Sequence, residues 1–160
     1  MNRQPTLIGD VTVVRPLRVG DFDELYAAGA DPMLWDQHPE NERWREDVFR
    51  AYFDDHLASG GALAVVDRAT GSLIGATRYD NYYPERSEVE IGWTFLARPY
   101  WGGAYNADLK RVMLEHAFRS VETVVFLVDA RNLRSRRAVE KLGAIESGSR
   151  RGMVLYAVHR

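Results

Sequence analysis

The sequence predicts an α/β fold of the α+β type, in which about four helices pack on both faces of a mixed, mostly antiparallel sheet. Short apolar and β-branched runs alternate with amphipathic segments at helical spacing, and turn-forming glycines stand at most of the junctions between them. No repeat or low-complexity linker divides the chain. With 160 residues, 46% of them hydrophobic, the chain 1–160 is expected to form a single domain with its own core.

The N-terminal third is predicted to contain one strand and two helices. Residues 12–17, TVVRPL, have the β-branched content of a short strand, and Gly20-Asp21 precede a helix expected to end near Gly29. Residues 42–58 place apolar side chains close to helical spacing, which predicts a long amphipathic helix. The side chains assigned to its apolar face are Trp44, Val48, Tyr52, Phe53 and Leu57.

The middle of the chain is predicted to form three consecutive antiparallel strands. Residues 62–67 and 72–79 are separated by the turn-forming segment 68–71, which is typical of a hairpin. A third strand, residues 89–96, follows a polar loop at residues 81–88.

In the C-terminal third, helices alternate with strands. A helix with its apolar side toward the sheet follows Gly103, and residues 123–128, TVVFLV, are nearly all apolar, as in a strand covered on both faces. A second helix is expected to begin near Asn132 and to end at Leu142-Gly143. Two strands close the chain, at residues 144–147 and 153–158.

Composition argues against several classes of function. The formal charge of −2 provides no basic field for nucleic acid, and the absence of cysteine removes disulfides, thiolate metal sites and cysteine nucleophiles. The four histidines lack paired metal-ligand spacing, so no metal site is predicted. No segment has the length and hydropathy of a membrane span or a secretion signal. We therefore expect a cytoplasmic protein that binds neither nucleic acid nor a membrane.

The segment 88–108 carries the clearest chemical signal in the sequence. An apolar strand passes through the glycine turn Gly102-Gly103-Ala104 directly into a helix. The first amides of a helix have no partner within it and lie at the positive end of its dipole, so they attract anions. No acidic side chain follows the turn before Asp108. The segment predicts a phosphate-binding site, although two glycines at such a turn also occur for reasons of geometry alone.

A second polar position opens the last predicted helix. Ser135 shares a helical face with Ala138, Val139 and Leu142, so its hydroxyl lies on an otherwise apolar, inward face. Asn132 stands at the start of the same helix. The alternative interpretation is that Asn132 only caps the helix and Ser135 only packs.

Together these segments resemble the GNAT superfamily of acetyl-CoA-dependent N-acetyltransferases, and within it the ribosomal-protein N-terminal acetyltransferases. The resemblance covers residues 88–145 by motif and nearly the whole chain by element order. It implies a sheet that splays between its fourth and fifth strands, residues 89–96 and 123–128, to form a cleft for the cosubstrate acetyl-CoA. The motifs that carry it are Glu90-Ile91-Gly92-Trp93, then Pro99-Tyr100-Trp101-Gly102-Gly103-Ala104-Tyr105, then Asn132, Ser135 and Glu140-Lys141-Leu142-Gly143-Ala144.

The resemblance also implies which residues contact acetyl-CoA. The pantetheine arm would bond to the backbone of residues 94–96, and the pyrophosphate would lie on the amides of residues 102–105. Asn132 would contact the pantetheine, and Ser135 would lie near the thioester sulfur. The full set assigned to acetyl-CoA is Thr94, Phe95, Leu96, Arg98, Trp101, Gly102, Gly103, Ala104, Tyr105, Asn132 and Ser135.

Two departures from the family pattern bear on catalysis. Pro99 stands where the family commonly has Gln or Arg, with Arg98 one residue earlier, and Val139 stands where many members have a tyrosine that acts as general acid. Ser135 is therefore the predicted general acid, and Glu90 is the predicted base. The alternative for Glu90 is an ordinary solvent-facing or salt-bridged strand carboxylate.

The implied activity is direct transfer of an acetyl group from acetyl-CoA to a primary amine of a protein N-terminus or a small molecule. The alternative is a non-catalytic acetyl-CoA-binding or regulatory module, which Pro99 and Val139 favour. A nucleotide-binding enzyme is a weaker third hypothesis, because neither GxxxxGK[ST] nor GxGxxG occurs. The acceptor stays open, and so does the oligomeric state, a homodimer included.

Other residues are candidates for the two ends of the cleft. Aromatic and histidine side chains that are candidates for the acceptor side are Trp35, His38, Tyr79, Tyr82 and Tyr83. Basic side chains that are candidates for the 3′-phosphate of CoA are Arg131, Arg134, Arg136, Arg137 and Lys141. For most of these basic residues a solvated charged face is the simpler interpretation.

Overall fold

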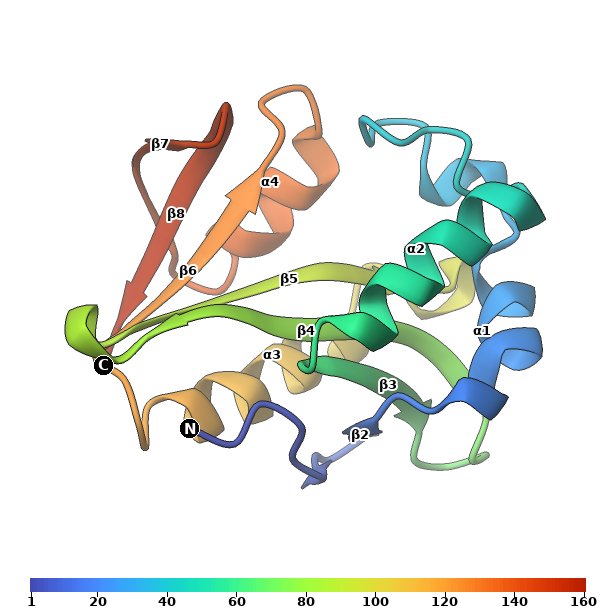
Figure 1. Cartoon of the computed structure of the whole chain (residues 1–160), viewed down its shortest axis with the longest axis horizontal. Helices are drawn as coiled ribbons and strands as arrows, with labels where there is room; N and C mark the ends of the chain where they lie inside the picture. The colour runs from blue at the N-terminus through green and yellow to red at the C-terminus, as the bar shows by residue number, and fades with distance from the viewer.

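The computed structural model describes residues 1–160 as one eight-stranded sheet with helices on both faces (Figure 1). The sheet order is β1-β2-β3-β4-β5-β6-β8-β7, and every neighbouring pair is antiparallel except β5 and β6, which are parallel. The strands are β1 (Leu7–Ile8), β2 (Thr12–Pro16), β3 (Ala62–Asp67), β4 (Leu73–Tyr83), β5 (Glu88–Leu96), β6 (Thr123–Val128), β7 (Ile145–Arg150) and β8 (Met153–His159). The helices are α1 (Phe22–Gly29), α2 (Glu46–Ala58), α3 (Ala104–Ala117) and α4 (Leu133–Glu140). The predicted mixed, mostly antiparallel α+β fold is confirmed.

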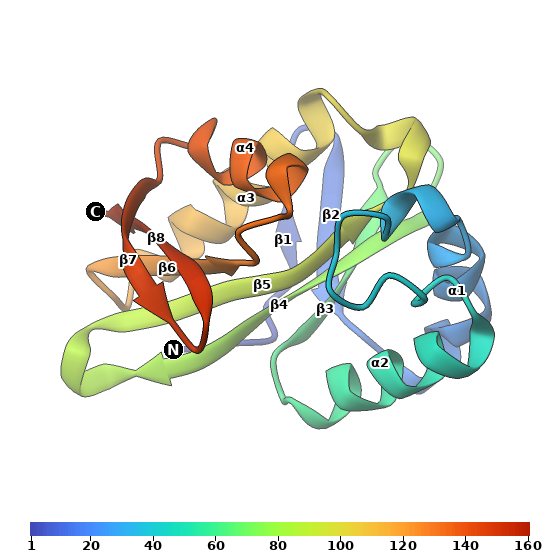
Figure 2. The ribbon, with the colours of Figure 1, turned by 90° about the horizontal axis from the view of Figure 1, so that it is seen from above.

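The sheet separates two hydrophobic cores. Helices α1 and α2 cover one face, while α3 and α4 cover the other (Figure 2). The core under α1 and α2 includes Leu25, Phe49 and Phe53, and the core under α3 and α4 includes Leu109 and Met113. None of the helices is both long enough and apolar enough to cross a lipid bilayer.

The predicted splay of the sheet is confirmed at the parallel pair. Strands β5 and β6 pair only where residues 88–90 lie opposite residues 123–125, and beyond that point they diverge (Figure 1). Strand β5 continues to Leu96 without a partner on this side, so the rest of its edge carries backbone groups that no neighbouring strand pairs. The region between the two diverging strands is called the β5–β6 opening below.

A β-bulge distorts β5 inside the opening. The register with β4 shifts between Ala76 and Arg78, opposite residues 93 and 94, and Trp93 has a left-handed backbone with φ of 51°. That conformation costs a residue with a side chain roughly 1 kcal/mol, so it persists only where the surroundings hold it. The bulge therefore marks a place where contacts from both faces of the sheet constrain β5.

Helix α2 is shorter than predicted. It begins at Glu46 instead of residue 42, because residues 41–45 form turns and Arg45 has the extended backbone of a residue preceding a helix. Its buried face is Phe49, Tyr52, Phe53 and His56, whereas Trp44 is 37% exposed. The assignment of Trp44 and Val48 to the buried face was wrong, since the later helix start turns Phe49 inward instead.

Two strand predictions also need correction. Strand β4 runs to Tyr83 through the segment that was predicted to be a polar loop, and its last residues pair with β5 at Glu90 and Glu88. Strand β1 was not predicted, because its two residues carry no periodic signal. It forms because Leu7 and Ile8 pair with Val14 and Val13 of β2.

Candidate functional site

The turn before α3 presents a row of unused backbone amides. None of the amides from Gly102 to Asn106 donates a hydrogen bond within the chain, and no side chain caps the helix. The first turn contains no acidic residue. Gly102 has φ of 74°, and a Cβ added at Gly102 or Gly103 would meet no atom within 4 Å. The turn is open and electropositive, which suits a phosphate group.

A hydrogen bond joins this turn to the end of β5. The indole Nε1 of Trp101 donates to the carbonyl of Leu96 at 2.8 Å. Ala97 donates its amide to Ile74 of β4, so by the alternation of a strand the backbone groups of Leu96 and Thr94 face the opposite, open edge. Phe95 buries its ring under α1 and α2. The predicted pantetheine edge at residues 94–96 therefore lies next to the predicted pyrophosphate turn.

The start of α4 holds the other two predicted polar residues. Asn132 is 8% exposed and caps the helix, its Oδ1 accepting the amide of Ser135 at 3.2 Å. The capping that the alternative interpretation required is thus present. The Nδ2 of Asn132 and the hydroxyl of Ser135 donate no hydrogen bond within the chain, and Ser135 is half-buried. Both groups are free to bind a ligand.

Glu90 lies at the closed end of the β5–β6 opening. It pairs in register with Val125, the last residue of β6 that still faces β5. Its side chain is 4% exposed, and Oε2 accepts from Arg151 Nη2 at 2.5 Å and from Asn81 Nδ2 at 2.7 Å. The neighbouring Glu88 pairs with Arg150 at 2.6 Å. The Glu90 carboxylate is therefore held in an ion pair of the kind that the alternative interpretation described.

Segment 31–45, between α1 and α2, is joined to residues on both sides of the opening. Arg98, which was assigned to acetyl-CoA, pairs with Asp31 at 2.8 Å and is half exposed. Arg134 of α4 is held by the same segment. Its amide donates to Gln37 Oε1 at 3.0 Å, its guanidinium pairs with Asp36 at 3.1 Å, and it stacks on Trp101 at 4.3 Å. The segment therefore connects β5, the glycine turn and α4.

Several of the basic residues proposed for a CoA phosphate are also engaged. Arg131 pairs with Asp129 at 3.1 Å, and Arg136 donates to Tyr156 at 2.8 Å. The Asp129 side chain holds the pKa of Arg131 above its usual value, and the hydrogen bond to Tyr156 does the same for Arg136. Arg137 and Lys141 are exposed and form no ion pair.

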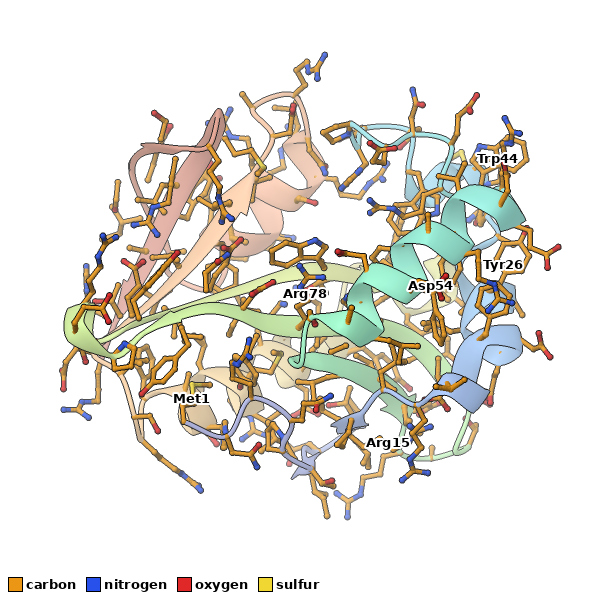
Figure 3. All side chains as sticks on the ribbon, in the orientation of Figure 1. Met1, Arg15, Tyr26, Trp44, Asp54 and Arg78 are labelled. Atoms are coloured by element: carbon orange, nitrogen blue, oxygen red, sulfur yellow. The ribbon has the colours of Figure 1, made fainter.

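Aromatic side chains gather on the α2 side of the bulge. The Tyr52 hydroxyl donates to the Trp93 carbonyl at 3.0 Å, and Arg78 stacks over the Trp93 ring at 3.5 Å. Figure 3 shows Arg78 between the sheet and α2, where it bridges Asp55 and Asp80. Trp35 packs its ring 5.3 Å from that of Phe95. This side of the opening thus combines aromatic surface with charged groups.

Of the acceptor-side candidates, Trp35 and His38 lie here, with ring centroids 5.8 Å apart. Burial and then the charge of Arg43 lower the pKa of His38 to about 4, so its ring is neutral at pH 7. Tyr79 was wrongly placed on the acceptor side. It is fully buried under α3, where its hydroxyl donates to the Met113 carbonyl at 2.6 Å.

Sequence reasoning missed a buried lysine on the opposite side of the bulge. Lys110 of α3 is 4% exposed, and its Nζ donates to Thr94 Oγ1 at 2.7 Å and lies 5.8 Å from the Phe126 ring centroid of β6. No carboxylate pairs with it, and burial lowers its pKa to about 7. The sequence did contain a sign of this burial, because Lys110 stands between Leu109 and Val112 on the apolar side of the helix.

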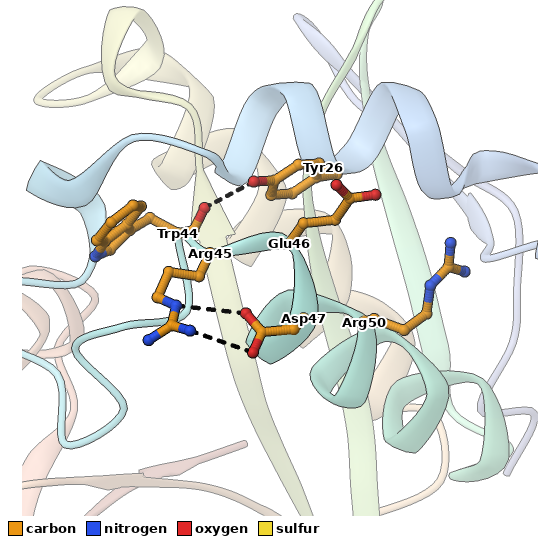
Figure 4. A pocket seen from close by; sticks show the side chains of 6 residues that line it. All are labelled: Tyr26, Trp44, Arg45, Glu46, Asp47 and Arg50. Atoms are coloured by element: carbon orange, nitrogen blue, oxygen red, sulfur yellow. Dashed lines mark hydrogen bonds and ion pairs between the residues drawn. The ribbon is translucent and has the colours of Figure 1, made fainter.

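Two surface hollows lie largely apart from these residues, and of the residues predicted for the site only Tyr105 lines one of them. One of about 650 Å³ lies at the outer ends of α1 and α2, where Tyr26 bonds to the Trp44 carbonyl and Arg45 pairs with Asp47 (Figure 4). Another of about 320 Å³ lies beside Asp67 and Tyr105. The first is lined mainly by exposed, mutually paired charges, so it lacks the convergent unpaired groups of the β5–β6 opening. No group of three or more His, Asp or Glu side chains is arranged to hold a metal ion.

Comparisons with known proteins agree with this geometry. The sequence profile of a family described as acetyltransferase (GNAT) domain matches residues 12–145. No protein of curated function matches the sequence. Among solved structures, a GCN5-related N-acetyltransferase from Brucella melitensis has a TM-score of 0.86 at 19% identity, covering 98% of this chain and 79% of its own.

Two further structures extend the comparison. A structure described as an acetyltransferase from T. thermophilus has a TM-score of 0.77 at 28% identity, covering 96% of this chain and 88% of its own. RimJ from Mycobacterium smegmatis, solved in complex with CoA-disulfide, has a TM-score of 0.69 at 18% identity, covering 97% of this chain and 86% of its own. The Brucella and Mycobacterium proteins, at such low identity, are similar to this chain in fold.

Proposed function

This chain belongs to the GNAT acetyltransferase family, and from that membership we propose that it transfers an acetyl group from acetyl-CoA to a primary amine. The observation that supports the proposal best is the row of unused amides from Gly102 to Asn106, joined through Trp101 to the open edge of β5. A pyrophosphate and an extended amide chain need these two features side by side.

The residues present fit acetyl-CoA as the donor. The amides at the start of α3 would hold the pyrophosphate, and the backbone of Thr94 and Leu96 would bond the pantetheine amides as an added strand. Asn132 Nδ2 is free to donate to the same arm. When bound, acetyl-CoA supplies an acetyl group activated as a thioester, from which an amine can displace the CoA thiolate.

In the proposed reaction the amine nitrogen forms a bond to the acetyl carbon, and the carbon–sulfur bond breaks with its electron pair on sulfur. An amide on the open edge of β5 would donate to the carbonyl oxygen as negative charge builds there. Ser135 would donate its hydroxyl proton to the departing sulfur and take one back from solvent, since its Oγ makes no other hydrogen bond. Glu90, directly or through water, would accept the proton that the amine loses.

The ion pair of Glu90 favours a second candidate function. The Glu90 carboxylate already accepts hydrogen bonds from Arg151 and Asn81 at Oε2, so this oxygen is less accessible to the proton of an incoming amine. With Val139 in place of a tyrosine, the chain has one obvious proton donor, Ser135. A non-catalytic module that binds acetyl-CoA is therefore the alternative to an active enzyme.

The test is acetyl-CoA binding by calorimetry together with thiol release against a panel of amines. Ser135→Ala should lower kcat by about 100-fold and leave the Kd for acetyl-CoA unchanged, because a general acid acts only in the chemical step. Glu90→Gln should lower kcat most strongly below the pKa of the acceptor amine, where the amine must lose a proton to react, and least above it.

Matched controls are Ser149→Ala and Glu115→Gln, which change exposed residues outside the opening. Both should keep wild-type kinetics. Failure to bind acetyl-CoA would contradict the proposed function, whereas binding without turnover of any amine would identify the non-catalytic module.

A further inference from the structure

Arg43 is a largely desolvated cation without an anionic partner. Its guanidinium lies 4.5 Å from the Tyr52 ring centroid and 5.1 Å from that of Trp35. It forms no ion pair and donates no hydrogen bond within the chain, and its Nε is buried without a partner. Burial lowers its pKa, although the nearby Tyr52 and Glu40 act in the opposite direction. A guanidinium in this state is poised to bind an anion.

Other partly buried arginines of the chain do have carboxylate partners. Arg78 contacts Asp55 and Asp80, Arg15 contacts Asp21, and Arg150 contacts Glu88, all within 3 Å. Arg43 therefore differs from these other partly buried arginines, because it has no carboxylate partner. Its two aromatic neighbours offset part of the lost hydration through cation–π contacts, yet they leave the in-plane N–H donors unused.

A single side chain, Tyr52, connects Arg43 to the bulge of β5. Tyr52, on which it stacks, bonds to the Trp93 carbonyl, and Trp35 packs on Phe95. Both contacts lie on the α2 side of the opening, whereas the pyrophosphate turn leads into α3 on the other side of the sheet (Figure 2). An acceptor that approaches the acetyl group from the α2 side would pass Arg43.

The charged and titratable groups around Arg43 leave its charge available. His38 is neutral at pH 7, Asp55 is taken by Arg78, and Glu40 forms no ion pair with the guanidinium. Asp129 acts on His38 from the end of β6 and pairs with Arg131. No neighbouring carboxylate therefore neutralises the guanidinium.

We propose that Arg43 binds a carboxylate of the acceptor, so that the preferred acceptors are amines that also carry a carboxylate group. The planar guanidinium would form a bidentate hydrogen-bonded ion pair with that carboxylate, and the rings of Trp35 and Tyr52 would hold the guanidinium in place. This inference rests on the proposed function. The carboxylate has two sources, a free amino acid or an acidic residue near the N-terminus of a polypeptide, and the acceptor panel separates them.

The kinetic experiment compares acceptors that differ only in the carboxylate. Free amino acids are compared with their amides, and short peptides with Asp at the second position are compared with the Asn peptides. For the carboxylated member of the preferred pair, Arg43→Gln should raise KM by about 10- to 100-fold, and for the uncharged member it should leave KM unchanged. Arg43→Lys should recover part of the loss. The control is Arg45→Gln, since Arg45 is exposed and pairs with Glu42 outside the opening.

A binding experiment tests the inference without turnover. N-acetylalanine and N-acetylalanine amide, which mimic a product with and without its carboxylate, are titrated while tryptophan fluorescence is recorded. The acid should bind about 10-fold or more tightly than the amide, and Arg43→Gln should abolish the difference. The Tm of Arg43→Gln should equal or exceed that of the wild type, because an unpaired desolvated charge does not stabilise the fold.

Different results would contradict the carboxylate site at Arg43 and the proposed acetyltransferase activity. Equal affinity for acid and amide, or equal losses on both in Arg43→Gln, would overturn the carboxylate site even if acetyl transfer is observed. Absence of acetyl-CoA binding would overturn the transferase while the product titration still decides the role of Arg43. A fall in Tm with no change in selectivity would show that Arg43 is structural, which also contradicts the inference.

Discussion

At the scale of single residues, Asp108 shows how one carboxylate joins segments far apart in the sequence. It lies on α3 and accepts hydrogen bonds from the amides of Asp10, Val11 and Thr12, each at 3.0 Å, and from Arg111 at 2.8 Å. Gly9 passes so close that a Cβ there would collide with the carboxylate. Burial alone would raise the pKa of Asp108, but the hydrogen bonds outweigh it and the pKa lies below its usual value.

We predict that Asp108→Ala destabilises the fold by about 3 kcal/mol, because the buried Thr12 and the amides of Asp10 and Val11 lose their acceptor. The loss should be read from urea unfolding. The stabilisation by the ionised carboxylate is complete above the unfolded pKa of about 3.8 and disappears as pH falls below it, since the folded pKa is lower. Glu115→Ala, at an exposed position on the same helix, should change stability by less than about 0.5 kcal/mol. Similar losses in the two variants would contradict this role for Asp108.

At the scale of elements, the beginning of α3 combines an open backbone with an absence of negative charge. A helix start that lacks a capping side chain forgoes roughly 1 kcal/mol of stability. The same start keeps its amides free for a ligand. Function and stability are therefore expected to respond in opposite directions to a negative charge placed there.

Ala104→Glu should weaken acetyl-CoA binding by about 10-fold or more, since a carboxylate at this exposed position repels a pyrophosphate. The Tm should stay constant or rise, because an acidic residue in the first turn interacts favourably with the helix dipole. Calorimetry and thermal unfolding measure the two effects. Ala104→Gln, which has nearly the same size, should bind acetyl-CoA like the wild type. A joint loss of binding and stability would indicate that the turn is merely misfolded in Ala104→Glu.

At the scale of the whole molecule, the two sides of the sheet differ in whether their buried polar groups have hydrogen-bond partners. The core under α3 contains Lys110, which has Thr94 as a hydrogen-bond partner. The region under α2 contains His56, which is fully buried, stacks on Tyr52 and has no partner at either ring nitrogen. Burial, followed by the charge of Arg78, lowers the pKa of His56 to about 3.

The free energy of unfolding should therefore decrease as pH falls below about 6.5. In that range the unfolded chain binds a proton at His56 that the folded chain excludes down to about pH 3, so stability is complete above pH 6.5 and lost below it. His38 acts in the same direction down to about pH 4. Uptake of one such proton changes the free energy of unfolding by at most about 1.4 kcal/mol per pH unit.

Urea unfolding between pH 7.5 and 4.5 measures this dependence. His56→Phe should flatten the curve, whereas His159→Gln, at an exposed position, should leave it as in the wild type. Parallel curves for the wild type and His56→Phe would show that His56 is not the group that takes up the proton.

The order of helices and strands follows from the sequence because it depends on local periodicity. Residues 123–128 have the length and β-branched content of a buried strand, and the glycine turn at residues 102–103 separates two elements. The start of α2 and the length of β4 were predicted less well, since a partner strand extends β4 and residues 41–45 leave the helix for turns that no local signal marks. For the candidate site, helix-start signals indicated Gly102 and Asn132, and the apolar face of the last helix indicated Ser135.

What only the tertiary structure decided is how charged side chains are partnered. The sequence by itself determined the order of helices and strands and predicted an anion-binding turn, because glycines, caps and apolar spacing act between residues close in the chain. The splay of the sheet was expected from the resemblance to the GNAT superfamily. The engagement of Glu90 by Arg151, of Arg98 by Asp31 and of Lys110 by Thr94, and the isolation of Arg43 between two rings, each join segments from different parts of the chain. Electrostatic free energies depend on those distances and on local burial, which no spacing rule contains.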